Sequence, residues 1–98
     1  MQVADKYSRI IGHLVPEGDL NVKMRTLLAN EIRRRLAEFD AVDRHFRHKY
    51  GGTLDEFERR EVVRERGYSF EVESDHQKWD AATDAIASLR KDLDELEH

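Results

Sequence analysis

Hydrophobic side chains recur every three or four residues through residues 20–50, which is the period of an amphipathic helix. Asp19 or Asn21 can cap the start of this run, and a pair of glycines follows its end. Arg35 and Asp43 fall on the same face, either at its margin or opposite a polar partner. We therefore predict one long helix. Its apolar positions are Leu20, Met24, Leu28, Ile32, Leu36, Phe39, Val42, Phe46 and Tyr50.

A short helix is predicted next, from Thr53 to a stop at Gly67. The sequence Thr53-Leu54-Asp55-Glu56 fits a capping box, in which the Thr53 hydroxyl and the Glu56 carboxylate each accept a bond from the other's backbone amide. The side chains expected to face inward from this helix are Leu54, Phe57 and Val62.

The pattern then changes to strict alternation, because Tyr68, Phe70 and Val72 are separated by polar residues. That period predicts an extended segment, which must lie on a helix or pair with another strand. A second capping box at residues 74–77 predicts the start of the last helix. From there the spacing alternates between three and four, as in a heptad seam of Trp79, Ala82, Ile86, Leu89, Leu93 and Leu96.

These elements predict an all-α fold: a long antiparallel helical hairpin with a short middle helix and an extended link. Two hairpins would form a dimeric four-helix core. The predicted core and dimer seam comprises Leu28, Ile32, Leu36, Phe39, Phe46, Ala82, Ile86, Leu89 and Leu93. Residues 1–19 form an N-terminal arm, whose pattern fits either a short strand or a fraying helix. The end of the chain, residues 96–98, resembles the start of a vector-encoded polyhistidine tail.

Composition supports this prediction. A chain of 98 residues with 39% charged and 39% hydrophobic residues forms a single domain, residues 1–98, with little material for a self-sufficient core. Elongated helices or an oligomer are the usual solutions. The chain has no cysteine, no apolar run of the ~18 residues that span a membrane and no signal peptide, so we expect a soluble, cytoplasmic protein.

Signals for catalysis and cofactors are weak. The serines lack a nucleophile motif, no glycine-rich loop matches a phosphate site, and a slender hairpin offers no cleft to shift a carboxyl pKa. His45 and His48 have the spacing of metal ligands, but two surface histidines are the ordinary explanation. We therefore expect no enzyme activity, no metal site and no cofactor.

Charge is divided unevenly along the chain. Residues 23–49 contain eight basic and four acidic residues, whereas residues 50–98 contain seven basic and fourteen acidic residues. Such halves can pair with each other or face a partner, or they can be solvated helix faces. The basic half offers possible phosphate contacts, although acidic residues intersperse them and nucleic-acid binding by the chain alone is not favoured. These residues are Arg33, Arg34, Arg44 and Arg47.

The strongest candidate for a binding site is the segment around residues 68–79, where aromatic side chains lie among carboxylates. Aromatic rings are common interface anchors, and the carboxylates would complement a basic protein. The alternative is that the apolar members close the hairpin's own core. The candidate partner-binding residues are Tyr68, Phe70, Glu71, Val72, Glu73, Asp75 and Trp79.

Residues 33–93 resemble a family of small helical antitoxin-like proteins of prokaryotic toxin–antitoxin pairs. The shared elements are a charged helix reaching "KYG", the cap "TLDEFE", the acidic "FEVESD" and a Trp that opens the last helix. The resemblance implies an antitoxin that neutralises a cognate toxin by direct binding, its acidic segment occluding a basic cleft. The alternatives are a self-associating structural or adaptor protein and, less favoured, a DNA-binding regulator.

Overall fold

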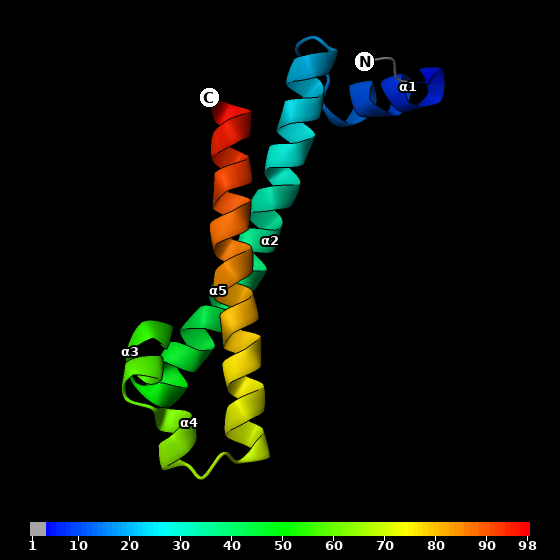
Figure 1. The fold of residues 1–98 in the computed structure, drawn as a ribbon. Coiled ribbons are helices and arrows are strands. Elements are labelled where there is room, and N and C mark those ends of the chain that lie inside the picture. The colour runs from blue at the N-terminus through cyan, green and yellow to red at the C-terminus, as the bar shows by residue number, and fades with distance from the viewer. Residues whose placement is uncertain (1–3) are drawn as a thin grey trace.

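The computed structural model describes residues 4–98, which form five α-helices and no strand (Figure 1). This confirms the all-α class. In chain order the helices are α1 (Asp5–Leu14), α2 (Leu20–Tyr50), α3 (Leu54–Arg59), α4 (Val62–Glu65) and α5 (Phe70–Glu97).

The long helix α2 begins and ends where its local signals predicted. Asp19 is the cap, and its carboxylate accepts a hydrogen bond from the Val22 amide at 2.9 Å. At the other end Gly51 takes the left-handed conformation with φ 71°, and its amide donates to the Arg47 carbonyl. Three basic residues in the last turn of α2 complement the negative end of the helix dipole.

The helix predicted after Thr53 is divided in two. Arg60 ends α3, and Glu61 takes a left-handed conformation with φ 52° before α4 begins. This break turns the chain so that Val62 joins Phe57 in the core, with exposed fractions of 3% and 2%. Gly67, with φ 65°, ends the segment as predicted.

The capping box at α3 is complete: Thr53 Oγ1 accepts from the Glu56 amide at 3.1 Å, and the Glu56 carboxylate accepts from the Thr53 amide at 3.5 Å. We expect Thr53→Ala to lower the free energy of unfolding by about 1 kcal/mol, because the Glu56 amide loses its acceptor. Urea unfolding followed by circular dichroism measures this. Thr53→Ser keeps the hydroxyl and serves as the control; equal losses in both variants would contradict the capping role.

The extended link predicted for residues 68–73 is wrong. Helix α5 already begins at Phe70, because Ser69 caps it by accepting from the Val72 amide at 3.3 Å. The second capping box, residues 74–77, therefore lies inside α5. Val72, Asp75 and Trp79 are spaced three and four residues apart, so the helix places all three on its buried face. Only residues 66–69 remain as the link between α4 and α5.

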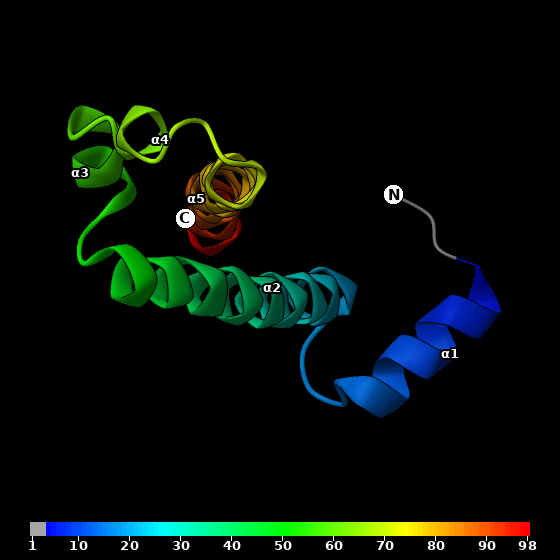
Figure 2. The same ribbon diagram turned by 90° about the horizontal axis from the view of Figure 1, so that it is seen from below.

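The hairpin of α2 and α5 dominates the packing, and its core lies at the end where α3 and α4 cover it (Figures 1 and 2). The core cluster consists of Phe46, Tyr50, Phe57, Val62, Val72 and Trp79. Beyond this end α2 and α5 diverge, and the molecule measures 58 × 25 × 22 Å. We call the compact end, formed by α3, α4 and the adjoining ends of α2 and α5, the head.

The N-terminal arm forms helix α1, which resolves the alternative between strand and helix for its described part; residues 1–3 lie outside the described residues. Helix α1 projects away from the hairpin (Figures 1 and 2) and buries none of its residues. At the other end of the chain, Leu96 and Glu97 belong to α5. Within residues 4–98, no helix combines the length and the apolar character needed to cross a membrane.

Candidate partner-binding surface

A polar network lies inside the head beside the aromatic core. Asp75 on α5 is buried, and its Oδ2 accepts a hydrogen bond from the Tyr50 hydroxyl at 2.7 Å and another from Lys49 Nζ. Lys49 also donates to Glu71 at 2.8 Å. This network joins the end of α2 to the start of α5, and it satisfies a carboxylate that burial would otherwise penalise.

The network shifts the titration of its members. Burial alone would raise the pKa of Asp75, but the hydrogen bonds from Lys49 and Tyr50 outweigh it and leave that pKa below its usual value. Burial, together with the bond to Asp75, raises the pKa of Tyr50 to about 12. Hydrogen bonds to Asp75 and Glu71 raise the pKa of Lys49. All three shifts favour the charge states that hold the network together.

Trp79 is the central side chain of the core, with no exposed surface. Its ring lies 5.3 Å from Phe57 and 5.7 Å from Phe46, measured between ring centroids. Its indole Nε1 donates to Asp43 Oδ1 at 2.8 Å. Asp43 was one of the two charged residues on the apolar face of α2, and Trp79 is the polar partner that explains its position. Arg35, the other, pairs with Glu31 at 2.9 Å.

Burial therefore divides the predicted partner-binding residues. Val72, Asp75 and Trp79 cannot reach a partner in the folded chain, because they are 4%, 8% and 0% exposed. For these three, the alternative that they close the chain's own core holds. The sequence pattern treated residues 68–73 as extended, which hid the single face of α5 that carries all three residues and packs beside Phe57 and Tyr50.

The other four predicted residues lie on the surface at the junction of α4 and α5. Phe70 is 88% exposed and Tyr68 is 61% exposed, although both are large aromatic side chains. Glu71 and Glu73 are exposed in the first turn of α5. Tyr68 also has a left-handed backbone with φ 56°, which is costly for a bulky residue. We call Tyr68, Phe70, Glu71 and Glu73 the junction surface.

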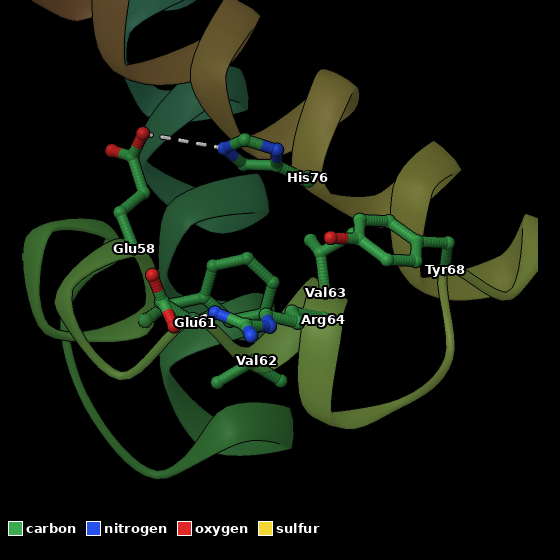
Figure 3. Close-up of a pocket in the computed structure, with 8 residues that line it drawn as sticks. Glu58, Glu61, Val62, Val63, Arg64, Tyr68 and His76 are labelled. Atoms are coloured by element: carbon green, nitrogen blue, oxygen red, sulfur yellow. Dashed lines mark hydrogen bonds and ion pairs between the residues drawn. The ribbon is translucent and has the colours of Figure 1, made fainter.

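A groove of about 420 Å³ adjoins the junction surface on the head (Figure 3). Its floor is apolar, formed by Phe57, Val62 and Val63, and Tyr68 closes one side. Its rim carries a hydrogen-bond contact between Glu58 and His76 Nε2 and an ion pair between Glu61 and Arg64, each at 3.3 Å. No signal in the sequence indicates this rim, because Glu58 and His76 come from different helices and no local spacing connects them. This groove can accept an apolar side chain flanked by charge.

The four arginines proposed as phosphate contacts lie on α2, and most of them already have partners. Arg34 pairs with both Glu31 and Glu38, and these partners raise the pKa of Arg34. Hydrogen bonds from Arg34 and Arg35 lower the pKa of Glu31 to about 2. Arg47 pairs with Asp43 at 2.8 Å, and Arg33 pairs with Glu97. Arg44 donates only a long bond to the Asp40 carbonyl. The neighbouring carboxylates reduce the charge that this helix offers to phosphate.

The predicted core and seam residues differ in how deeply they are buried. Phe46, Ala82 and Ile86 are buried between α2 and α5, so they belong to the hairpin's own core. Leu28 is 51% exposed, and the remaining members are half-buried: Ile32, Leu36, Phe39, Leu89 and Leu93.

Among the described residues, no group of three His, Asp or Glu side chains could hold a metal ion, and His45 and His48 are both exposed on α2.

Comparison with known proteins found no match: no protein-family model, no curated protein and no solved structure matches the chain. Function must therefore be inferred from the surfaces of the chain itself.

Proposed function

We propose that this chain is a non-catalytic protein-binding module that acts as an antitoxin, neutralising a cognate toxin by direct binding and occlusion. The observation that carries the proposal is the exposure of Tyr68 and Phe70 beside Glu71 and Glu73. Exposure of an aromatic side chain to water is energetically unfavourable, and aromatic side chains are frequent interface anchors. The proposed setting is the cytoplasm of a prokaryotic cell.

The carboxylates define the kind of partner. Glu71 and Glu73 lie in the first turn of α5, and the whole helix carries nine acidic and three basic residues. A basic protein surface would complement this helix, as the active-site cleft of an RNA-cleaving toxin would. The chain would present these carboxylates on a helical end, with Phe70 projecting ahead of them, and no extended strand would enter the partner's cleft.

The backbone of Tyr68 supports the same proposal. A tyrosine in the left-handed region costs on the order of 1 kcal/mol or more, and such strain is common where function requires a side chain in a given place. The conformation directs Tyr68 to the edge of the groove on the head (Figure 3). Tyr68 would thus connect the groove with Phe70 in one continuous contact area.

Co-expression with the product of the adjacent gene tests the proposal, read out by complex purification and by rescue of growth. We expect the double variant Tyr68→Ala/Phe70→Ala, and separately Glu71→Lys/Glu73→Lys, to weaken binding by at least about tenfold, because an interface anchor contributes more than ~1 kcal/mol. Both sets lie on the surface, and the exposed pair of Glu71 with Lys49 that the second variant removes contributes little to stability. Far-ultraviolet circular dichroism should therefore match the wild type.

The matched control is Asp84→Lys/Asp94→Lys, which makes the same charge change at exposed positions of α5 outside the head. This control should bind and rescue like the wild type. The proposal is overturned if the adjacent gene product does not bind the chain, or if the junction variants neutralise it as well as the control does.

A further inference from the structure

The chain by itself exposes more surface than its mass requires. Its accessible surface is 7344 Å², whereas a compact protein of 11.6 kDa exposes about 5,800 Å². Its radius of gyration is 19.1 Å, against about 13 Å for a compact chain of 98 residues. The surplus of about 1,500 Å² exceeds the ~800 Å² that each partner buries in a standard interface. This area is available for a second chain.

Part of the surplus lies in a groove between α2 and α5 on the side of the hairpin away from α3 and α4. Figure 2 views the hairpin nearly along α5, with α3 and α4 on one side of that helix and no element against the other. The groove has a volume of about 640 Å³. Phe39, Val42 and Ala81 give it an apolar lining. Lys78 adds a cation and His45 an imidazole, and the carboxylate of Asp75, which also lines the groove, is already bonded to Lys49 and Tyr50.

A second groove of about 440 Å³ lies where the two helices diverge toward the open end of the hairpin. Leu28, Ile32 and Leu96 line it, together with the carboxylates of Asp92 and Glu95. We call the first groove the basic groove and the second the acidic groove, after these side chains.

Helical periodicity places both grooves on the same side of the hairpin. The eighteen positions from Lys78 to Leu96 amount to about five turns, so both side chains project from one face of α5. On α2, Leu28, Ile32 and Phe39 fall within about 40° of one another. The two grooves therefore form one interrupted apolar surface with a basic and an acidic end.

From this arrangement we propose that a second copy of this chain docks on that surface in the antiparallel orientation, so that the basic groove of each copy covers the acidic groove of the other. A two-fold axis then passes near Ala85, which lies seven residues from Lys78 and seven from Asp92. Because of the two-fold symmetry, the contact between Lys78 of one copy and Asp92 of the other is made twice. The product is a four-helix bundle.

Charge selects the occupant and its orientation. In the antiparallel orientation α5 of one copy lies along α5 of the other, so Lys78 of each copy meets Asp92 of its partner copy. A parallel pair would instead place Lys78 beside Lys78 and Asp92 beside Asp92, which is repulsive. The contacts also differ from the junction surface, so this inference goes beyond the proposed antitoxin role.

Sedimentation equilibrium of the full chain tests the proposal. We expect a mass of twice 11.6 kDa for the wild type. Lys78→Glu alone, or Asp92→Lys alone, should each weaken the dimer at least tenfold, because the symmetry duplicates every repulsive contact. The combined variant Lys78→Glu/Asp92→Lys should restore the dimer. A structural defect in either single variant would not be repaired in this way, and circular dichroism checks that each stays helical.

Cysteine cross-linking tests the orientation, since the natural chain contains no cysteine. Ala85→Cys should oxidise to a covalent dimer because the axis brings the two copies of residue 85 together, whereas Lys78→Cys should not. The proposal is overturned by a monomeric wild type, by single charge variants that dimerise normally, or by cross-linking through residue 78 in place of residue 85.

Discussion

Replacing Trp79 with alanine is expected to lower the free energy of unfolding of this protein by about 3–5 kcal/mol. The side chain is fully buried and contacts aromatic rings from both α2 and α3. A domain of this size is stable by only about 5–15 kcal/mol, so the loss is a large fraction of that stability and the urea midpoint should fall markedly. The loss combines removed apolar contacts with a cavity that the rigid head cannot close.

The measurement is urea unfolding followed by circular dichroism, with two comparison variants. Trp79→Phe keeps an aromatic ring but loses the hydrogen bond to Asp43, so it should fall between the wild type and Trp79→Ala. Phe70→Ala removes a ring that is 88% exposed and should change stability little. Similar losses for Trp79→Ala and Phe70→Ala would show that Trp79 is not the centre of the core.

The second large effect is expected at Asp75. Asp75→Ala should lower the free energy of unfolding by about 1–3 kcal/mol, because it leaves the buried Tyr50 hydroxyl without an acceptor and removes one of the two partners of Lys49. Asp75→Asn keeps an acceptor and loses only the charge, so a smaller loss is expected. The double variant Tyr50→Phe/Asp75→Ala isolates the hydrogen bond between these two residues. Its loss in free energy of unfolding should be smaller than the sum of the losses in the two single variants.

The same residue predicts a dependence on pH. The pKa of Asp75 in the folded chain lies below its ordinary value of 3.8, so its stabilisation is complete above about pH 4 and is lost as pH falls through the folded-state pKa. The pKa of Tyr50 is raised from 10.0 to about 12, so the contribution of its neutral hydroxyl is lost as pH rises through that interval. Asp75→Asn should show a shallower acid loss than the wild type; identical acid profiles would contradict this role.

Several elements could be predicted from the sequence because their signals are local. Asp19, Gly51 and Thr53 cap helix ends through groups within four residues of themselves, so neighbouring letters suffice to locate them. The stripe along α2 likewise depends only on helical period.

Other features depended on packing between distant segments. The alternation at residues 68–73 indicated an extended segment, but Val72 and Trp79 gain more by facing Phe57 and Tyr50 from one side of a helix, and this tertiary contact overrode the local pattern. The break at Glu61 has the same origin, because it delivers Val62 to that core. No local spacing relates Asp75 to Tyr50, or Asp43 to Trp79 across the hairpin.

The sequence by itself thus determined the helical class, the caps at Asp19, Gly51 and Thr53 and the uneven charge, all of which arise from neighbouring residues or from composition. Only the tertiary structure decided which aromatic and acidic side chains are internal and which face solvent. The reason is physical: exposure is set by what the rest of the chain covers. Trp79 and Phe70 are both aromatic residues of one helix, yet one lies at the centre of the head and the other projects into solvent.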